Sequence, residues 1–496
     1  MLSLPFAHHL GARLSLATVV AALAALSLRG ADQPITVTLD ARVARGAVSA
    51  EFAGLSYEVT AVLPAANGRH YFAPDNTGLV TLFRSLGIGS LRVGGNTSDR
   101  NAARLPSPAD LDALFGFARA AGVRVIYCLR LHDGDPAADA ATAKYIMNRY
   151  APWVDCFSIG QEPSAYPVGP AERDHVAPHP AGAMKEKYPY SRYHDEWRRF
   201  ARTIIAAVPG VRFCGPSVHN NAAWTNRFIA DFGRGYHVTL VSAHLYAGGA
   251  ATAVASDQLA RDWMLSSHFT SVCERLASAV EPHLEATRLP FRLEETNSYY
   301  NGGRLGASDT FASALWGLDY LDWWAAHGAA GLNFHTGDGV SMNGGIHAPA
   351  YGVFTSGADG YDIKPLAYAL KAFSLAGPGT VLPVAAPGAP AALAAYAVRS
   401  GDQLTITLIN RSHDADAKEI AVTLEPGDRW HRAKVVTLRD RNGEVAARTG
   451  ITLGGAPIDP HGGWDGHWSP VPAGPSDHTF SLTVPAASAA IIRLDR

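Results

Sequence analysis

Short apolar runs alternate with longer amphipathic stretches between about residue 50 and residue 377. The longer stretches, among them Pro108–Ala121, Tyr190–Ala207 and Thr310–Ala326, carry apolar residues at helical spacing. Alternating strands and helices are typical of a parallel sheet covered by helices. Eight such units predict an α/β fold, a (β/α)₈ TIM barrel spanning residues 49–377. The eight predicted strands are Phe52–Glu58, Ser90–Val93, Val123–Leu129, Val154–Ile159, Val211–Gly215, Val238–His244, Phe291–Glu295 and Ala330–His335.

The pattern changes after residue 377. Leu404–Ile409, Ala433–Leu438 and Phe480–Val484 alternate apolar with polar residues, and turns rich in Gly, Asp and Asn separate them. These runs predict a C-terminal antiparallel β-sandwich domain over residues 378–496. An alternating strand at Ile35–Leu39 precedes the barrel, so residues 32–48 are a candidate N-terminal addition to that sandwich.

The amino-terminal end carries the pattern of an export signal. Arg13 precedes a largely apolar run, Leu14–Leu28, which has the length of the apolar part of a signal peptide and is short for a membrane span. We expect residues 1–31 to be a signal peptide and the mature protein to be exported, periplasmic or extracellular. An uncleaved anchor is the alternative. After signal removal, no remaining run predicts a membrane contact.

Composition and charge narrow the classes of partner. A net charge of −2 and a pI near 6.9 provide no long-range attraction to nucleic acid, so no nucleic-acid partner is expected. Hydrophobic residues make up 47% of the chain, which is ample for a buried core. Cys128, Cys156 and Cys214 lie in apolar strand-like runs, and with Cys273 they are predicted to be free, buried thiols. The sequence carries no signal for an oligomeric state.

Two predicted strands end in glutamates. Glu162 follows Val154–Ile159, and Glu295 ends Phe291–Glu295. In a parallel barrel the carboxyl ends of the strands form the reaction face, so both carboxylates are candidate catalysts. Glycoside hydrolysis needs one carboxylic acid to protonate the leaving oxygen and one ionised carboxylate to attack the anomeric carbon. The pair therefore predicts a retaining glycosidase with Glu162 as acid/base and Glu295 as nucleophile.

Glu294 is the rival nucleophile. Side chains alternate between the two faces of a strand, so Glu294 and Glu295 are not expected to point into the cleft together. Alternation alone leaves both residues open as the nucleophile.

An ordered set of motifs resembles clan A of the glycoside hydrolases, and more specifically glycoside hydrolase family 79, the β-glucuronidases and heparanase-like enzymes. Each motif is weak alone, but the set covers most of the mature chain, and the trailing sandwich also fits this family. The motifs are Gly54-Leu55-Ser56-Tyr57-Glu58, Leu91-Arg92-Val93-Gly94-Gly95-Asn96-Thr97-Ser98-Asp99, Gly160-Gln161-Glu162-Pro163, His244-Leu245-Tyr246, Glu295-Thr296-Asn297-Ser298 with Tyr300 and Asn301, and a helix containing Ala314–Tyr320.

The resemblance implies roles for individual residues. It makes Glu162 the acid/base, and it selects Glu295, directly before Thr296, over Glu294 as the nucleophile. It also implies that Tyr246 donates a hydrogen bond to the nucleophile and that His335 lies near a substrate carboxylate. The substrate-binding candidates are Glu58, Asn96, Gln161, Tyr246, Tyr300, Asn301, His335 and Tyr351.

Other side chains near the predicted strand ends have structural interpretations. Arg92 is expected to brace the carboxylates through charge-assisted hydrogen bonds. The loop aromatics Tyr166, Tyr299 and Tyr351 are candidates for stacking on sugar rings. His132, His219 and His244 lack the spacing of a metal site, so no metal and no other cofactor is expected.

Two departures from family 79 bear on the substrate. Gln161 stands where the family usually has an asparagine that holds the sugar 2-hydroxyl, and no Gly-Tyr pair follows His335 to meet a uronate carboxylate. The leading expectation is a β-glucuronidase acting on glucuronides or uronate-containing glycans by double displacement. The alternatives are a clan A β-glycosidase of neutral sugars, a xyloside or galactoside, and an inactive glycan-binding protein on the same scaffold.

Overall fold

The computed structural model describes residues 33–40, 42–99, 104–166, 188–342 and 345–496. Eight strands close into a barrel in the order β10-β3-β4-β5-β6-β7-β8-β9, and all neighbours are parallel. The (β/α)₈ prediction is confirmed, although β7, β8 and β9 continue further than predicted. The strands are β3 Ala53–Glu58, β4 Ser90–Gly94, β5 Arg124–Leu129, β6 Val154–Ile159, β7 Phe213–His219, β8 Val238–Tyr246, β9 Phe291–Asn297 and β10 Gly331–His335.

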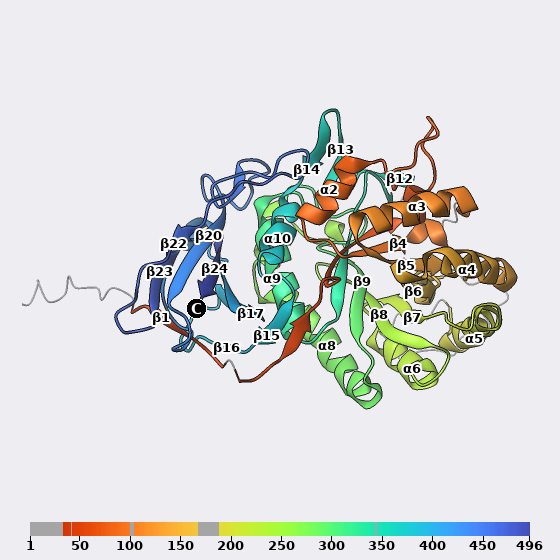
Figure 1. Ribbon diagram of the computed structural model, residues 1–496, viewed down its shortest axis with the longest axis horizontal. Helices are drawn as coiled ribbons and strands as arrows, with labels where there is room; N and C mark the ends of the chain where they lie inside the picture. Colours follow the sequence, from red (N-terminus) through yellow and green to blue (C-terminus); the bar gives the residue numbers. More distant parts are fainter. Residues whose placement is uncertain (1–32, 41, 100–103, 167–187, 343–344) are drawn as a thin grey trace, which may run out of the picture.

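Helices surround the barrel (Figure 1). They are α2 Thr77–Ser85, α3 Pro108–Ala121, α4 Pro136–Tyr150, α5 Tyr190–Ala207, α6 Ala222–Phe232, α7 Asp257–Met264, α8 Ser267–Thr287, α9 Phe311–Ala326 and α10 Pro365–Ser374. Helix α3 shows why some bounds were readable from sequence. Ser107 and Asp110 form a capping box, Pro108 takes the first helical position, and Gly122 ends the helix with φ 80°.

Two short hairpins follow the last barrel strand. They pair β11 Val340–Met342 with β12 Gly345–His347, and β13 Phe354–Gly357 with β14 Gly360–Ile363. The first hairpin follows directly from the carboxyl end of β10, at the reaction face.

Two further sheets pack against each other in a sandwich beside the barrel (Figure 1). One contains β16 Val384–Ala385, β1 Ile35–Leu39, β19 Ile420–Glu425 and β23 Phe480–Val484. The other contains β2 Gly46–Val48, β15 Gly379–Leu382, β17 Leu393–Ser400, β18 Gln403–Asn410, β24 Ser488–Asp495, β20 Arg432–Asp440 and β21 Ile451–Leu453, with β22 Ser469–Pro470 beside β20. Residues from both sheets share one hydrophobic core. The chain before the barrel contributes one strand to each sheet.

One pairing differs from the predicted antiparallel arrangement. Strand β1 runs parallel to β19, with Ile35 opposite Val422. These strands lie far apart in sequence and no hairpin joins them, so nothing forces an antiparallel return.

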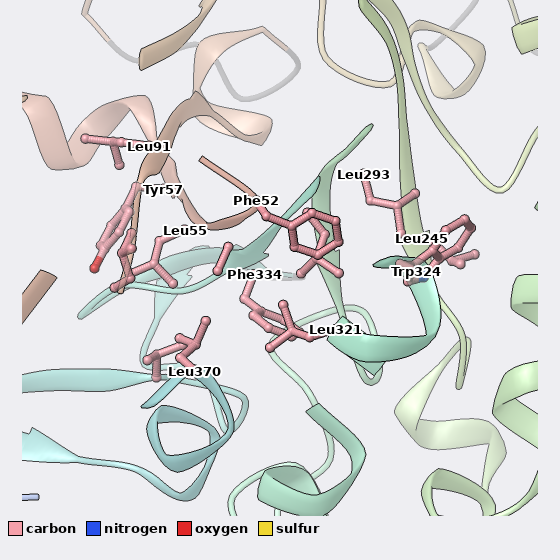
Figure 2. Packing of buried hydrophobic residues seen from close by; sticks show 14 of the residues in the cluster. Phe52, Leu55, Tyr57, Leu91, Leu245, Leu293, Leu321, Trp324, Phe334 and Leu370 are labelled. Atoms are coloured by element: carbon pink, nitrogen blue, oxygen red, sulfur yellow. The ribbon is translucent and has the colours of Figure 1, made fainter. Parts of the chain in front are cut away.

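Helices α9 and α10 lie between the barrel and the sandwich (Figure 1). Helix α9 is buried around nearly its whole circumference because it packs on both bodies. Trp323 and Trp324 are buried on it. Figure 2 shows Trp324 in one hydrophobic cluster with Leu245 and Leu293 of the barrel strands.

The four cysteines are free and buried, as predicted. Within the residues that the structure describes, none of the helices has both the length and the apolar character that a membrane crossing requires. The predicted signal peptide, residues 1–31, lies outside the described residues.

Candidate active site

The polar side chains of the site converge at the carboxyl ends of four barrel strands. Arg92 comes from β4, Glu162 follows β6, and His244 lies near the end of β8, with Glu295 on β9. One oxygen of Glu162, one nitrogen of His244 and one oxygen of Glu295 all lie within 4.8 Å of one another. The structure thus brings the two predicted catalytic glutamates into one site.

A β-bulge on β9 determines how its two glutamates point. Ala243 pairs with Leu293 but His244 pairs with Glu295, so β9 has one extra residue, Glu294, against β8. The register with β10 shifts at the same place. Leu293 packs in the outer hydrophobic cluster (Figure 2).

Glu294 and Glu295 both face His244, whose ring lies 3.4 Å from the first carboxylate and 3.9 Å from the second. The alternation expected for these two side chains is therefore wrong, because a bulge suspends it. The expectation that they do not both point into the cleft agrees with their burial. Glu294 is completely buried, and Glu295 is slightly exposed above it.

Three donors hold the Glu295 carboxylate. Arg92 Nη1 donates to Oε2 at 2.7 Å, and Gln161 Nε2 donates to the same oxygen at 3.0 Å. Tyr246 donates its hydroxyl to Oε1 at 2.9 Å. Arg92 therefore braces the carboxylate as the sequence indicated.

The pKa of Glu295 follows from these contacts. Burial alone would raise the pKa of this carboxyl. Electrostatic interactions with His335, His244 and Arg92 oppose that effect, and the hydrogen bond from Gln161 adds to them. Together they hold the pKa of Glu295 well below its ordinary value, so the group is ionised at neutral pH.

Glu162 is fixed by its backbone. Its φ of 47° and ψ of 55° are left-handed, and its N–H donates to Ser217 O on β7 at 3.0 Å. Its Oε1 lies 3.1 Å from His244 Nδ1. The side chain is 14% exposed, so this carboxyl is open to the cleft.

His244 stands between carboxylates. It is fully buried, with Nδ1 toward Glu162 and Nε2 3.4 Å from Glu294 Oε1. Burial would lower the pKa of the ring. The charge of Glu295 and the hydrogen bonds to Glu162 and Glu294 outweigh burial and raise the pKa of His244 to about 9. The imidazole is therefore a cation at neutral pH.

Two consecutive glycines let the buried charges approach the backbone. A Cβ on Gly94 would lie 2.4 Å from the Arg92 guanidinium carbon. Gly95 has φ 72°, and a Cβ there would lie 2.3 Å from a Glu58 carboxylate oxygen. The Gly-Gly pair in the second strand motif thus leaves room for a cation on one side and a carboxylate on the other.

Glu58 is placed differently from its predicted role. It is 1% exposed, and its Oε2 accepts from the backbone N–H and hydroxyl of Thr97 at 2.8 and 2.7 Å. Its Oε1 accepts from Ser341 N at 3.0 Å and lies 3.6 Å from His335 Nε2. In this arrangement Glu58 fastens the loops after β4 and β10 and offers no open face to a sugar.

Gln161 is likewise occupied within the protein. Its side-chain oxygen accepts from Arg92 Nη2, and its nitrogen donates to Glu295. Its backbone N–H donates to Asp99 Oδ2 at 3.0 Å. The amide expected to hold a sugar hydroxyl therefore links Arg92 to the nucleophile candidate.

Sequence reasoning missed Asp99 as a supporting group. Its carboxylate also accepts from the Tyr166 hydroxyl and from His132 N at 2.6 Å. Burial raises the pKa of Asp99 to about 6, although these hydrogen bonds oppose the rise. Asp99 is the last residue of the motif that begins at Leu91, and that position was the sequence signal that could have identified it.

The loop aromatics lie inside the protein. Tyr166, Tyr299 and Tyr351 are all buried, so none forms an exposed stacking platform and that prediction is wrong. Tyr166 bonds Asp99, and Tyr299 donates to Ala260 O at 2.9 Å. These phenols reach polar partners in the interior, which a sequence pattern does not display.

The remaining binding candidates form one wall of the site. Tyr246 and Tyr351 pack with Val340, and Tyr300 lies partly buried against them. Asn301 is exposed at the end of this wall.

His335 and Asn96 complete the set of predicted binding residues. The ring of His335 lies 6.2 Å from that of Tyr351, and its Nδ1 lies 3.1 Å from Ser56 Oγ. Asn96 is partly buried at the start of the short turn after β4.

Two groups of side chains have the spacing of metal ligands among the described residues. One is Glu162, His244 and Glu295, and the other, between α7 and the sandwich, is Asp262, His413 and Asp414. A ligating imidazole must be neutral. The raised pKa of His244 and the guanidinium of Arg92, 2.7 Å from Glu295, therefore favour an acid–base network in the first group.

Comparison with known proteins agrees with this architecture. No protein-family model matches the chain. A β-glucuronidase from Aspergillus niger is 28% identical over 161 residues, which are 29% of this chain and 29% of that protein. A β-glucuronidase from Neurospora crassa is 32% identical over 105 residues, 20% of this chain and 18% of that protein. The chain thus matches less than a third of the length of either relative.

A solved structure extends the likeness of fold over the whole barrel and sandwich. The crystal structure of a 4-O-α-L-rhamnosyl-β-D-glucuronidase from Fusarium oxysporum superposes with a TM-score of 0.69 at 19% identity. The superposition covers 93% of this chain and 100% of that one. At this identity the likeness shows the fold.

Proposed function

We propose that this protein is a retaining β-glycosidase that hydrolyses β-glucuronides or uronate-containing glycans. The observation that carries the proposal is the pairing of Glu162 and Glu295, in which one carboxylate oxygen of each lies within 4.8 Å of one of the other. Retaining enzymes hold their two carboxyl groups about 5–5.5 Å apart, whereas inverting enzymes leave about 6.5–9.5 Å for a water. The short separation supports double displacement.

The two glutamates have environments suited to different roles. Glu295 is held ionised by Arg92, Gln161 and Tyr246, as a nucleophile must be. In the first step, it attacks the anomeric carbon while Glu162 gives its proton to the departing oxygen. In the second step, Glu162 takes a proton from water, the water oxygen bonds to the anomeric carbon, and Glu295 leaves as a carboxylate.

The choice of a glucuronide rests on the relatives and on the family 79 motifs. Both partial relatives are β-glucuronidases, and the superposed structure is a glucuronidase. The motif residues Arg92, Glu162, Tyr246 and Glu295 all meet in one site. On these grounds we propose that the protein is a member of family 79. Export is a separate proposal that rests on the apolar run Leu14–Leu28 after Arg13.

The surroundings of His335 support the neutral-sugar alternative. His335 is the residue matched to the uronate carboxylate, and it lies 3.6 Å from Glu58, a carboxylate that already occupies it. A uronide would have to compete for this ring, whereas a xyloside or galactoside would not.

The test is hydrolysis of aryl β-glycosides by the purified protein. We expect release of the aryl group from the β-glucuronide, with retention of configuration at the anomeric carbon. Glu295→Gln should abolish turnover, with a loss of about 10⁴-fold or more. Equal turnover by the variant would remove Glu295 from the mechanism. Faster hydrolysis of the xyloside or galactoside would favour the neutral-sugar alternative, and binding without product would favour a glycan-binding protein.

Glu162→Gln separates the acid from the nucleophile. A substrate with a good leaving group, such as dinitrophenol, needs little protonation in the first step. We expect this variant to accumulate a glycosyl-enzyme that mass spectrometry detects, because the second step still lacks its base. Glu295→Gln, the matched control, should accumulate none.

A further inference from the structure

Glu294 is a buried carboxylate for which the two-step reaction has no role. It is completely buried below the bulge, so it cannot touch a substrate. Its Oε1 lies 3.4 Å from His244 Nε2, and its Oε2 accepts from Cys214 Sγ at 3.5 Å. His244 thus lies between Glu294 and the acid/base candidate Glu162.

Both ring nitrogens of His244 face carboxylate oxygens. Nδ1 lies 3.1 Å from Glu162 Oε1, and Nε2 faces Glu294. A neutral imidazole carries only one N–H, whereas an imidazolium carries two and can donate to both neighbours. This row of three residues therefore favours the doubly protonated ring.

Resting on the proposed function, we infer that Glu294 is a positioning residue that keeps His244 cationic and so holds the buried charge of the site balanced through both chemical steps. In the free protein, Arg92 and His244 are positive and Glu294 and Glu295 are negative, and the proposed reaction requires Glu162 to carry a proton. After the first step, Glu295 is a neutral ester, and Glu162 has become a carboxylate by giving up its proton. Two positive and two negative charges remain in each state.

The balance depends on Glu294 because it is the one carboxylate of the three that reacts in neither step. Without it, both states would carry one excess positive charge in a buried site, which is costly. The ring would then lose a proton. Glu162 would lose the imidazolium that steadies it as a carboxylate in the glycosyl-enzyme.

The other groups around this row leave that balance intact. Burial raises the pKa of the Cys214 thiol on β7 well above its ordinary value, so the thiol stays neutral. Burial also raises the pKa of Cys156 on β6. The Tyr193 phenol on α5 and the Tyr246 phenol on β8 likewise have pKa values raised well above the ordinary range.

Other ionisable groups lie beyond the row. Glu58 Oε1 lies 3.6 Å from His335 Nε2. Asp99 accepts its hydrogen bonds from Gln161, Tyr166 and His132, and it makes none to His244 or Glu294 among the described residues.

The decisive experiment is an NMR titration of the imidazole of His244 in ¹³C,¹⁵N-histidine-labelled protein. The His244 signals are assigned by their loss in His244→Gln. We expect the ring to remain an imidazolium up to about pH 9 in the unaltered protein. In Glu294→Gln, which preserves size and removes the charge, the midpoint should fall by about one pH unit or more.

Asp322→Asn is the matched control. Asp322 is a buried carboxyl on α9. Burial raises its pKa well above the ordinary value, and it makes no hydrogen bond to His244 or Glu294 among the described residues. The His244 midpoint should not move in this variant. A midpoint near the ordinary histidine value of about 6.5 in the unaltered protein, or the same midpoint in Glu294→Gln, would overturn the inference. The first of these readings needs no variant to fold.

Kinetics separate this inference from the proposed function. With an aryl β-glucuronide, Glu294→Gln should lose about 10–100-fold in kcat, and its activity should decline at a lower alkaline pH than that of the unaltered protein. Glu294→Asp should recover part of both. If no aryl glycoside is hydrolysed although the titration behaves as expected, the proposed function fails and the assignment of Glu294 to His244 stands. If hydrolysis proceeds while Glu294→Gln keeps the full alkaline profile, the inference fails alone.

Discussion

Two sets of buried carboxyl groups in this protein face opposite electrostatic surroundings. Glu294 and Glu295 lie beside the cations Arg92 and His244, which outweigh burial and lower the pKa of both carboxyls. Asp139 on α4 and Asp322 on α9 are also buried, but their raised pKa values reflect burial first and the charges of neighbouring carboxylates second. One oxygen of each aspartate has no hydrogen-bond partner among the described residues.

The contrast separates what burial does from what partners do. Desolvation penalises the charged form in all four groups, so the direction of the pKa shift depends on whether nearby cations and donors outweigh burial. Arg92 on β4 and His244 on β8 outweigh burial at the site glutamates. Arg130 does not outweigh it at Asp139, and the shift of Asp322 reflects burial and the charge of Asp319. Carboxyls of lowered pKa thus lie at the strand ends, and Asp139 and Asp322 keep raised pKa values in the helical layer.

The largest effect is expected from removing Arg92, the cation closest to Glu295. Arg92→Met leaves Glu295 buried without its closest cation, so we expect a loss of about 3–5 kcal/mol in the free energy of unfolding, measured by urea denaturation. The acidic limb of kcat/KM should move to higher pH, because the pKa of Glu295 is no longer held down.

Arg292→Met provides the control for Arg92. Arg292 is also a buried arginine of the barrel, but it donates to Asn333 Oδ1 at 3.0 Å and to backbone carbonyls of Glu51 and Phe52. It should lose stability without moving the acidic limb. An unmoved acidic limb in Arg92→Met would contradict the role of this cation.

Tyr246→Phe should sharpen the contrast by removing one donor to Glu295. The hydroxyl donates to Oε1 at 2.9 Å, and a hydrogen bond to a charged group contributes about 1.5–3 kcal/mol. We expect kcat to fall about 10–100-fold with little change in KM. Tyr299→Phe removes a buried phenol hydroxyl bonded to a backbone carbonyl, so it should lower stability and leave kcat alone. Equal losses of kcat in the two variants would mean that Tyr246 acts only through packing.

The sequence predicted the barrel strands and helices better than the placement of the buried carboxylates. Strand and helix patterns repeat over many residues, so the eight barrel strands could be read directly, and α3 was bounded by its caps. Glu162 and Glu295 were recognisable because each follows an apolar strand. A bulge depends on the register with two neighbouring strands, and local alternation therefore misplaced Glu294.

Burial of polar groups was the other information missing from the sequence. Glu58 and Gln161 both occur in motifs that the family resemblance assigned to sugar binding. The structure gives their polar atoms to Thr97, Ser341, Arg92 and Glu295 instead. Which partner a polar side chain meets depends on tertiary contacts between loops distant in sequence.

Asp139 represents the buried carboxyls whose pKa is raised, and its titration should make the stability of the protein depend on pH. Burial raises its pKa to about 8 from 3.8. The folded state therefore holds a proton that the unfolded chain releases above about pH 4, and this group makes stability fall as pH rises from about 4 to 8. Asp139→Asn cannot ionise. It should match the unaltered protein at pH 4 and be about 1–2 kcal/mol more stable at pH 5.5, by urea denaturation at both values. A constant difference between the two pH values would mean that Asp139 does not titrate in this range.

The smallest effect is expected where the helical layer meets the sandwich. Asp319 on α9 accepts from Tyr396 Oη at 2.7 Å and from Arg411 Nη1 at 2.8 Å, so unlike Asp322 it has a cation. Tyr396→Phe removes one of these bonds and leaves the ion pair, which should cost about 1 kcal/mol and lower Tm by a few degrees. Glycosidase kinetics should not change, because this carboxylate lies behind the barrel wall from Glu295. A loss of stability several times larger in a calorimetric scan would contradict this prediction. It would show that the Tyr396 phenol contributes more than Arg411 to holding Asp319, so a neighbouring cation would not be enough to stabilise a buried carboxylate.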